Sequence, residues 1–134
     1  MSIGSGIETE IKLRLPDAAT GRQLVRRAGL KVKRRRKFES NLVYDTAESS
    51  LRQRGELLRL RSSGRDMVLT FKGRPVPARH KTREELETAL GDITVMDQIL
   101  RHLGFQGVFR YEKYRTEYAP ERGTGVVTLD ETPI

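Results

Sequence analysis

Residues 7–15, near the N-terminus, alternate apolar and ionisable side chains with the period of a β-strand. Successive side chains of a strand point to opposite faces, so one face of this segment would be almost entirely aliphatic and the other entirely ionisable. The ionisable face reads Glu8, Glu10, Lys12 and Arg14, with acids first and bases after. Half-buried strands ordinarily pair an apolar face with mixed polar residues. The segment therefore predicts a strand that adds both signs of charge to one face of a sheet.

Alternating segments recur along the chain and predict six further strands. We expect them at about residues 33–45, 56–61, 67–72, 81–88, 108–118 and 126–130. Apolar residues at helical spacing predict two connecting helices, which begin after the N-caps Asp17 and Asp92. Residues 49–56 are expected to form a turn. An antiparallel series of this kind is typical of a barrel or strongly curled sheet, and 134 residues are most simply one domain, 1–134.

The overall charge indicates an anionic partner. Lys and Arg number 26 against 18 Asp and Glu, a formal net charge of +8. The chain has no cysteine, which excludes disulfides and thiolate metal sites. The first residues do not resemble a signal peptide, and no stretch approaches the ~18 apolar residues of a membrane span. We therefore expect a soluble cytoplasmic protein that does not engage a membrane.

The charged faces, if they point into one lumen, would place acids and bases together. The acids would be Glu8, Glu10, Glu85, Glu87 and Asp130, and the bases Lys12, Arg59, Arg61, Lys72, Arg83, Lys113 and Arg115. Clustered carboxylates hold Mg²⁺ or Mn²⁺, and clustered Arg and Lys hold phosphate oxygens. Because the bases outnumber the acids, such a lumen suits a polyphosphate with its metal better than a bare cation.

The order of the charged segments resembles a known family. Glu8-x-Glu10-x-Lys12 is similar to the N-terminal signature of the CYTH proteins, also called triphosphate tunnel metalloenzymes. Six later segments agree in order: Tyr44-Asp45-Thr46, Leu58-Arg59-Leu60-Arg61, Leu69-Thr70-Phe71-Lys72, Arg83-Glu84-Glu85-Leu86-Glu87, Lys113-Tyr114-Arg115 and Leu129-Asp130-Glu131-Thr132-Pro133. The family takes in class IV adenylate cyclases, thiamine triphosphatases and inorganic triphosphatases.

The resemblance implies an antiparallel β-barrel, or tunnel, of about eight strands with two connecting helices outside and a metal site within. By position, Glu8, Glu10 and Asp130 would lie on the side of the Mg²⁺ or Mn²⁺ ion, with Glu85 and Glu87 close by. Lys12, Arg59, Arg61, Lys72, Lys113 and Arg115 would hold the triphosphate, and Arg83 could do so or pair with the carboxylates. The family normally continues into a last strand with another Glu-x-Glu pair, which this chain lacks before it stops at Ile134. The unpaired strand edge leaves both a monomer and a homodimer open.

Two reactions on a triphosphate remain open. Hydrolysis, of an inorganic, thiamine or nucleoside triphosphate, is favoured over cyclisation of ATP to cyclic AMP and pyrophosphate, although both need the same clamp and metal. Glu8 and Glu10 would be catalytic through the metal, and Lys12 could be the general base only if neighbouring bases depress its pKa. A non-catalytic polyphosphate binder is a third reading. A nucleic-acid-binding module is disfavoured, because the ordered carboxylates would repel a phosphate backbone in the absence of metal.

Overall fold

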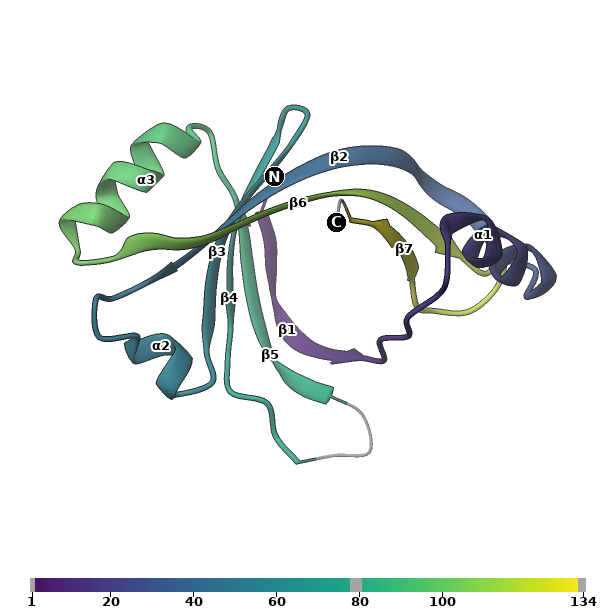
Figure 1. Ribbon diagram of the computed structural model, residues 1–134, viewed down its shortest axis with the longest axis horizontal. Coiled ribbons are helices and arrows are strands. Elements are labelled where there is room, and N and C mark those ends of the chain that lie inside the picture. The colour runs from purple at the N-terminus through teal and green to yellow at the C-terminus, as the bar shows by residue number, and fades with distance from the viewer. Residues whose placement is uncertain (1, 78–80, 133–134) are drawn as a thin grey trace. The chain divides into compact units, whose positions relative to one another are not determined.

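The computed structural model describes the backbone of residues 2–77 and 81–132, and the side chains of all of these except residues 2–5, 8, 9 and 81 (Figure 1). Seven strands form one sheet in the order β1-β5-β4-β3-β2-β6-β7. The strands are β1 (Ser2–Glu10), β2 (Lys31–Asp45), β3 (Leu57–Ser63), β4 (Asp66–Lys72), β5 (Lys81–Ala89), β6 (Gln106–Ala119) and β7 (Val127–Glu131). The helices are α1 (Ala18–Arg27), α2 (Ser50–Gln53) and α3 (Ile93–His102).

The fold class expected from the sequence, an antiparallel sheet with connecting helices, is confirmed. The strand pairings β1–β5, β5–β4, β4–β3, β3–β2 and β6–β7 are all antiparallel. Helices α1 and α3 begin where predicted, because the carboxylates of Asp17 and Asp92 accept hydrogen bonds from the backbone N–H groups of Thr20 and Val95. No helix in the described ranges is long and apolar enough to cross a membrane.

Two predictions about the secondary structure are wrong. The first strand ends at Glu10, which lies opposite Lys81 of β5, and it does not continue to Leu15. The second error lies at residues 49–56, which contain the short helix α2 in place of a simple turn. The chain therefore has three connecting helices and not two.

The chain divides into two compact units, each with its own core. The first unit comprises Met1–Lys12 and Ser40–Tyr111, and the second comprises Leu13–Glu39 and Glu112–Ile134. In the first unit, α3 packs on one face of the central strands (Figure 1). The core there consists of Tyr44, Leu60 and Leu100, with Leu42, Leu58, Leu69, Leu90, Ile93, Met96 and Phe105 packed against them. Burial of these aliphatic and aromatic groups stabilises that face of the sheet.

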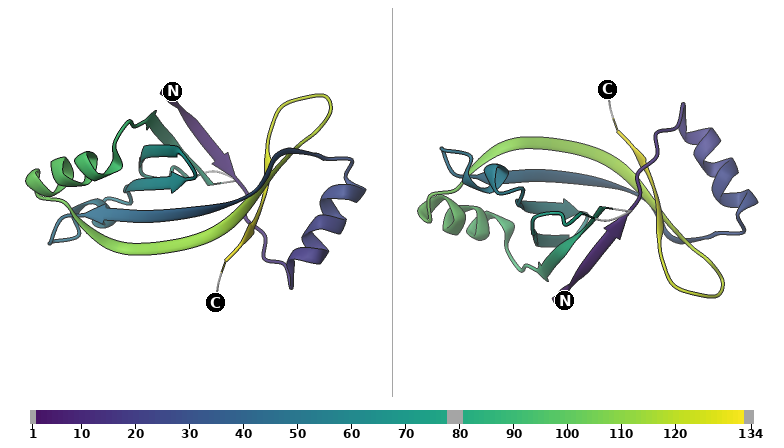
Figure 2. Two further views of the ribbon diagram at one scale, coloured as in Figure 1. Left: turned by 90° about the horizontal axis from the view of Figure 1, so that it is seen from above. Right: turned by 90° about the horizontal axis from the view of Figure 1, so that it is seen from below.

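The second unit has a smaller core between α1 and the β6–β7 hairpin. Val25 of α1 packs with Tyr118 of β6 and Leu129 of β7 (Figure 2). Gly21 allows the close approach of α1, since a Cβ at that position would lie only 2.5 Å from Cδ1 of Leu129. The helices α1 and α3 thus each cover an apolar sheet face within their own unit, and the opposite faces carry the charged side chains.

The carboxylate of Asp45 organises the connection between β2 and β3. Asp45 is 5% exposed, and its two oxygens accept hydrogen bonds from the backbone N–H groups of Thr46, Leu51 and Arg52 at 2.7, 2.9 and 3.1 Å. Two of these donors belong to α2, which the side chain holds in place. Burial would raise the pKa of Asp45, but the hydrogen bonds outweigh it and lower the pKa below the ordinary 3.8.

We expect Asp45→Ala to lower the free energy of unfolding by about 2–3 kcal/mol, because buried backbone donors lose a charged acceptor. Urea unfolding of the wild type and the variant at pH 7 measures this difference. Since the pKa is lowered in the folded state, the stabilisation is fully present above pH 3.8 and is lost as the pH falls through the lowered value. Asp45→Asn, which keeps an acceptor but no charge, should fall between the two. Equal stabilities at pH 7 would contradict the assignment.

Candidate active site

The strand register brings the predicted charged residues of the first unit onto one face of its sheet. Directly opposed residues of an antiparallel pair share a face. Between β1 and β5, Glu8 lies opposite Arg83. Between β5 and β4, Glu85 lies opposite Lys72 and Glu87 lies opposite Thr70. Thr70 in turn lies opposite Arg59 of β3, and Arg61 of β3 lies opposite Asn41 of β2. Strand alternation adds Glu10 to the side of Glu8. This face, which we call the charged face of the first unit, lies opposite the face that α3 covers.

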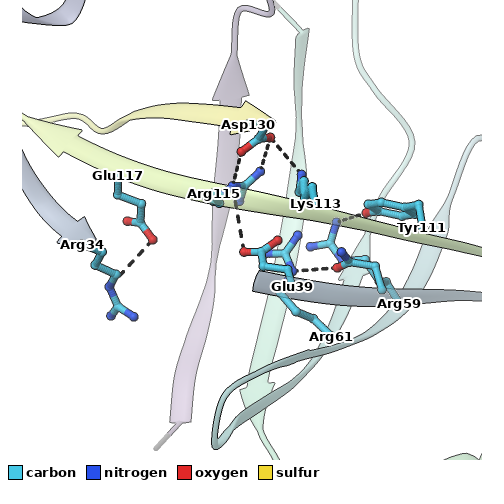
Figure 3. Close-up of polar contacts among 10 residues, drawn as sticks. Arg34, Glu39, Arg59, Arg61, Tyr111, Lys113, Arg115, Glu117 and Asp130 are labelled. Atoms are coloured by element: carbon cyan, nitrogen blue, oxygen red, sulfur yellow. Dashed lines mark hydrogen bonds and ion pairs between the residues drawn. The ribbon is translucent and has the colours of Figure 1, made fainter. Parts of the chain in front are cut away.

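Arg59 is a buried cation at the centre of the charged face. It is only 7% exposed, and its Nη1 donates a hydrogen bond of 3.2 Å to the hydroxyl of Tyr111 (Figure 3). Its Nε is buried and has no hydrogen-bond acceptor among the described residues. Within the described part of the chain, no carboxylate forms an ion pair with this guanidinium. A buried charge without a counter-ion destabilises a folded protein by several kcal/mol in rough terms, so this position suits an anionic ligand.

The acids of the charged face alternate with bases and hydroxyl groups. Lys72, 7% exposed, places its Nζ 3.4 Å from Oε2 of Glu85. The hydroxyl of Thr70 donates a hydrogen bond of 3.2 Å to Oε1 of Glu87. Among the described side chains, no three or more acidic or histidine residues gather closely enough to hold a metal ion. Each of these two carboxylates therefore has a protein donor at hand.

The backbone nevertheless leaves room for an ion beside the acids. Gly6 of β1 lies opposite Glu85 in the register, and a Cβ added to Gly6 would have no heavy atom within 4 Å. Mg²⁺ is ordinarily held by one or two carboxylates together with water and substrate phosphates. The described carboxylates of this face, which are Glu10, Glu85 and Glu87, are donors of the kind that this ion takes.

The second unit holds a separate cluster around Asp130, which lies opposite Arg115 in the β6–β7 register. The Nε and Nη2 atoms of Arg115 donate to the two oxygens of Asp130 at 2.7 and 2.8 Å, and Nζ of Lys113 donates to Oδ2 at 2.9 Å (Figure 3). A carboxylate of Glu39 lies 4.0 Å from Arg115. Burial would raise the pKa of Asp130, but the hydrogen bonds from Arg115 and Lys113 lower it to about 2. Asp130 is therefore ionised and engaged by two bases.

We expect Asp130→Ala to destabilise the second unit, because Lys113 and Arg115 would lose their shared carboxylate. The side chain of Asp130 is 27% exposed, so solvent screening reduces the effect to roughly 1–2 kcal/mol. Thermal unfolding monitored by circular dichroism measures the loss. Glu121→Ala, which removes an exposed acid from the connection between the same two strands, is the control and should leave the melting temperature within about a degree.

Two of the predicted site residues are placed differently from expectation or only partly described. Lys12 is exposed and lies beyond the end of β1, so the strand ladder does not hold it on the charged face. The side chain of Glu8 falls outside the described part of the structure, and only its register is known. The roles of all the predicted site residues remain predictions.

The sequence analysis missed Glu39 and Asn41, which are both buried polar residues of β2. The alternation of β2 could have identified them. Leu42 and Tyr44 belong to the apolar core, so the odd-numbered residues at this end of the strand point to the opposite face.

Comparisons with known proteins identify the family and the fold. The model of the CYTH domain family matches residues 6–133. A protein of Methanocaldococcus jannaschii, provisionally named an adenylate cyclase, is 31% identical over 115 residues, which are 86% of this chain. The chain spans 65% of the length of that relative.

Solved structures show the same fold. A provisionally named adenylate cyclase from Vibrio parahaemolyticus matches with a TM-score of 0.72 and 20% identity over 97% of this chain and 70% of that one. A Pyrococcus horikoshii protein matches with a TM-score of 0.67 and 28% identity over 78% of this chain and 60% of that one. A Hippeastrum protein, provisionally named an adenylyl cyclase and described as having a dominant triphosphatase activity, matches with a TM-score of 0.66 and 19% identity, covering 96% and 72% of the two chains. The family match over nearly the whole length, together with the shared fold, establishes that this chain belongs to the CYTH domain family.

Proposed function

We propose that this protein is a metal-dependent triphosphatase that binds its substrate on the charged face of the first unit. The observation that carries the proposal is the buried guanidinium of Arg59, which has no carboxylate partner among the described residues. A triphosphate would supply the missing negative charge. Arg61, Lys72 and Arg83 lie on the same face and would share the remaining phosphate oxygens.

The activities named for other CYTH proteins support a triphosphate as the substrate class. Members of the CYTH family are adenylate cyclases and triphosphatases, and both act on triphosphates. The Hippeastrum protein, whose dominant activity is triphosphatase, shares the fold at 19% identity. The fold therefore accommodates hydrolysis, which we favour for this chain.

In the proposed reaction, water attacks the terminal phosphorus and the bond from that phosphorus to the bridging oxygen breaks. The rest of the substrate leaves as the diphosphate, the attacking water loses a proton to solvent, and orthophosphate is formed. The bases of the charged face would neutralise the phosphate oxygens and orient the chain of phosphates. A Mg²⁺ or Mn²⁺ ion, held by Glu8, Glu10 and the acids of β5, would polarise phosphoryl oxygens and offset their charge when bound.

The second candidate is adenylate cyclisation, which the name of the M. jannaschii relative favours. There the ribose 3′-hydroxyl attacks the α-phosphorus of ATP and pyrophosphate leaves. The same clamp would serve both reactions, since the choice depends on which phosphorus faces the nucleophile.

Product analysis separates the candidates. The purified chain is incubated with tripolyphosphate, thiamine triphosphate or ATP, with Mg²⁺, with Mn²⁺ and with a chelator. We expect metal-dependent release of orthophosphate. Cyclic AMP and pyrophosphate from ATP would identify a cyclase instead. Metal-dependent binding without any product would leave a non-catalytic binder, and the absence of both binding and turnover would refute the proposal.

A further inference from the structure

Asn41 is a fully buried polar residue on the charged face of the first unit. Its side chain is 0% exposed, and the register places it opposite Arg61 of the neighbouring strand β3. Asparagine is seldom fully buried unless its amide is hydrogen-bonded. Arg61 is a proposed phosphate-binding residue, so the hydrogen-bond partners of the neighbouring Asn41 amide bear on the binding site.

One half of the amide is satisfied by Arg61. The Nε of Arg61 donates a hydrogen bond of 2.8 Å to Oδ1 of Asn41. A guanidinium can only donate, so the atom that faces Arg61 must be the amide oxygen, and the amide nitrogen must point elsewhere. The hydrogen bond fixes the orientation of both side chains.

The other half of the amide lacks an acceptor. Nδ2 of Asn41 is buried and has no hydrogen-bond partner among the described residues. The Nε of Arg59 is likewise buried and has no hydrogen-bond partner among the described residues. Because Val43 lies opposite Arg59, Asn41 and Arg59 are diagonal neighbours on one face, about 7–8 Å apart at Cα. Two residues that each carry a buried donor without an acceptor are therefore diagonal neighbours on adjacent strands.

We propose that Asn41 is a substrate-binding residue whose Nδ2 donates a hydrogen bond to a phosphoryl oxygen, alongside Arg59, while its Oδ1 positions Arg61. This inference rests on the proposed function and names one more residue of the same site. A phosphoryl group has several acceptor oxygens, so it can accept hydrogen bonds from Nδ2 of Asn41 and Nε of Arg59 at the same time.

The test is calorimetric binding of tripolyphosphate to the full chain and its variants in the presence of Mg²⁺. Asn41→Leu is nearly isosteric and removes the donor and the acceptor, and we expect it to weaken binding about tenfold or more. If Asn41 only positioned Arg61, its substitution would have no effect on binding once Arg61 is removed. We therefore compare Arg61→Ala with the double variant Asn41→Leu/Arg61→Ala, and expect a further loss of about fivefold or more in the double variant.

Gln98→Leu, which removes an exposed amide from α3 in the same unit, is the matched control and should bind as the wild type does. If Asn41→Leu does not fold, Asn41→Asp replaces it, because the carboxylate keeps the acceptor for Arg61 and lacks the donor. That variant should melt near the wild-type temperature and bind at least about tenfold more weakly.

Several outcomes would overturn the inference. Unchanged affinity of Asn41→Leu or Asn41→Asp would do so, as would the absence of any further loss in the double variant, which would reduce Asn41 to a residue that only positions Arg61. If the wild type binds and turns over a triphosphate while the Asn41 variants are normal, only this inference fails. If the wild type does not bind tripolyphosphate, the proposed function fails with it.

Discussion

The Glu10→Gln variant is expected to lose metal-dependent triphosphate turnover by at least about a hundredfold while it retains its fold. Glu10 lies at the end of β1 on the same face as Glu8, next to β5, whose Glu85 and Glu87 face the same side. The amide keeps the size of the side chain but removes the charge that a Mg²⁺ or Mn²⁺ ion requires. Because changes to residues that only support metal ligands already reduce activity about 10–100-fold, loss of a ligand should cost at least as much.

The matched control is Glu84→Gln. Glu84 is exposed and lies opposite Ile7 in the same strand pair, on the other face of the sheet. The two variants have the same change in charge, so a general electrostatic effect would alter both. Turnover is measured with Mg²⁺ and Mn²⁺ over a range of concentrations, together with a circular dichroism spectrum. Wild-type turnover by Glu10→Gln would remove Glu10 from the proposed metal site.

The Lys72→Ala variant is expected mainly to weaken triphosphate binding and to raise KM by about 10–100-fold with a smaller effect on kcat. Lys72 is buried on the charged face, and its ammonium group lies 3.4 Å from Glu85. Removing it takes away a cation that is already desolvated, and the loss of one charge-assisted contact corresponds to about 1.5–3 kcal/mol. A contact present in both the bound substrate and the transition state affects KM more than kcat.

Arg65→Ala serves as the control, since Arg65 is an exposed cation between β3 and β4, at the opposite end of β4 from Lys72. Its loss changes the net charge equally without changing the charged face. Steady-state kinetics of both variants with tripolyphosphate give KM and kcat separately. A normal KM for Lys72→Ala would exclude this lysine from the phosphate clamp, and Lys72→Arg should restore most of the affinity.

Local alternation allowed much of the fold and the charged face to be predicted. Arg59 and Arg61 of β3 lie two positions apart, as do Arg83, Glu85 and Glu87 of β5, so the residues of each strand share a face by strand geometry. The register confirms that Arg59, Lys72 and Glu85 face the same side. The caps of α1 and α3 were likewise predictable, because an N-cap depends on residues only two or three positions apart.

Partners distant in the sequence were not predictable in this way. The strand β1 pairs with β5, which lies some seventy residues later in the sequence. The helix α2 depends on the carboxylate of Asp45, which reaches the backbone of Leu51 and Arg52. These features arise from hydrogen bonds between distant residues, which the periodicity of the sequence does not indicate.

The sequence by itself determined that this chain folds into antiparallel strands with a charged face, because side-chain alternation is a property of each strand alone. Only the tertiary structure decided which charges are compensated. Asp130 is held by Arg115 and Lys113, whereas Nε of Arg59 and Nδ2 of Asn41 are buried donors that no described residue satisfies. Burial and pairing depend on how separate strands come together, and that is why the residues that most need a ligand became apparent only in the folded chain.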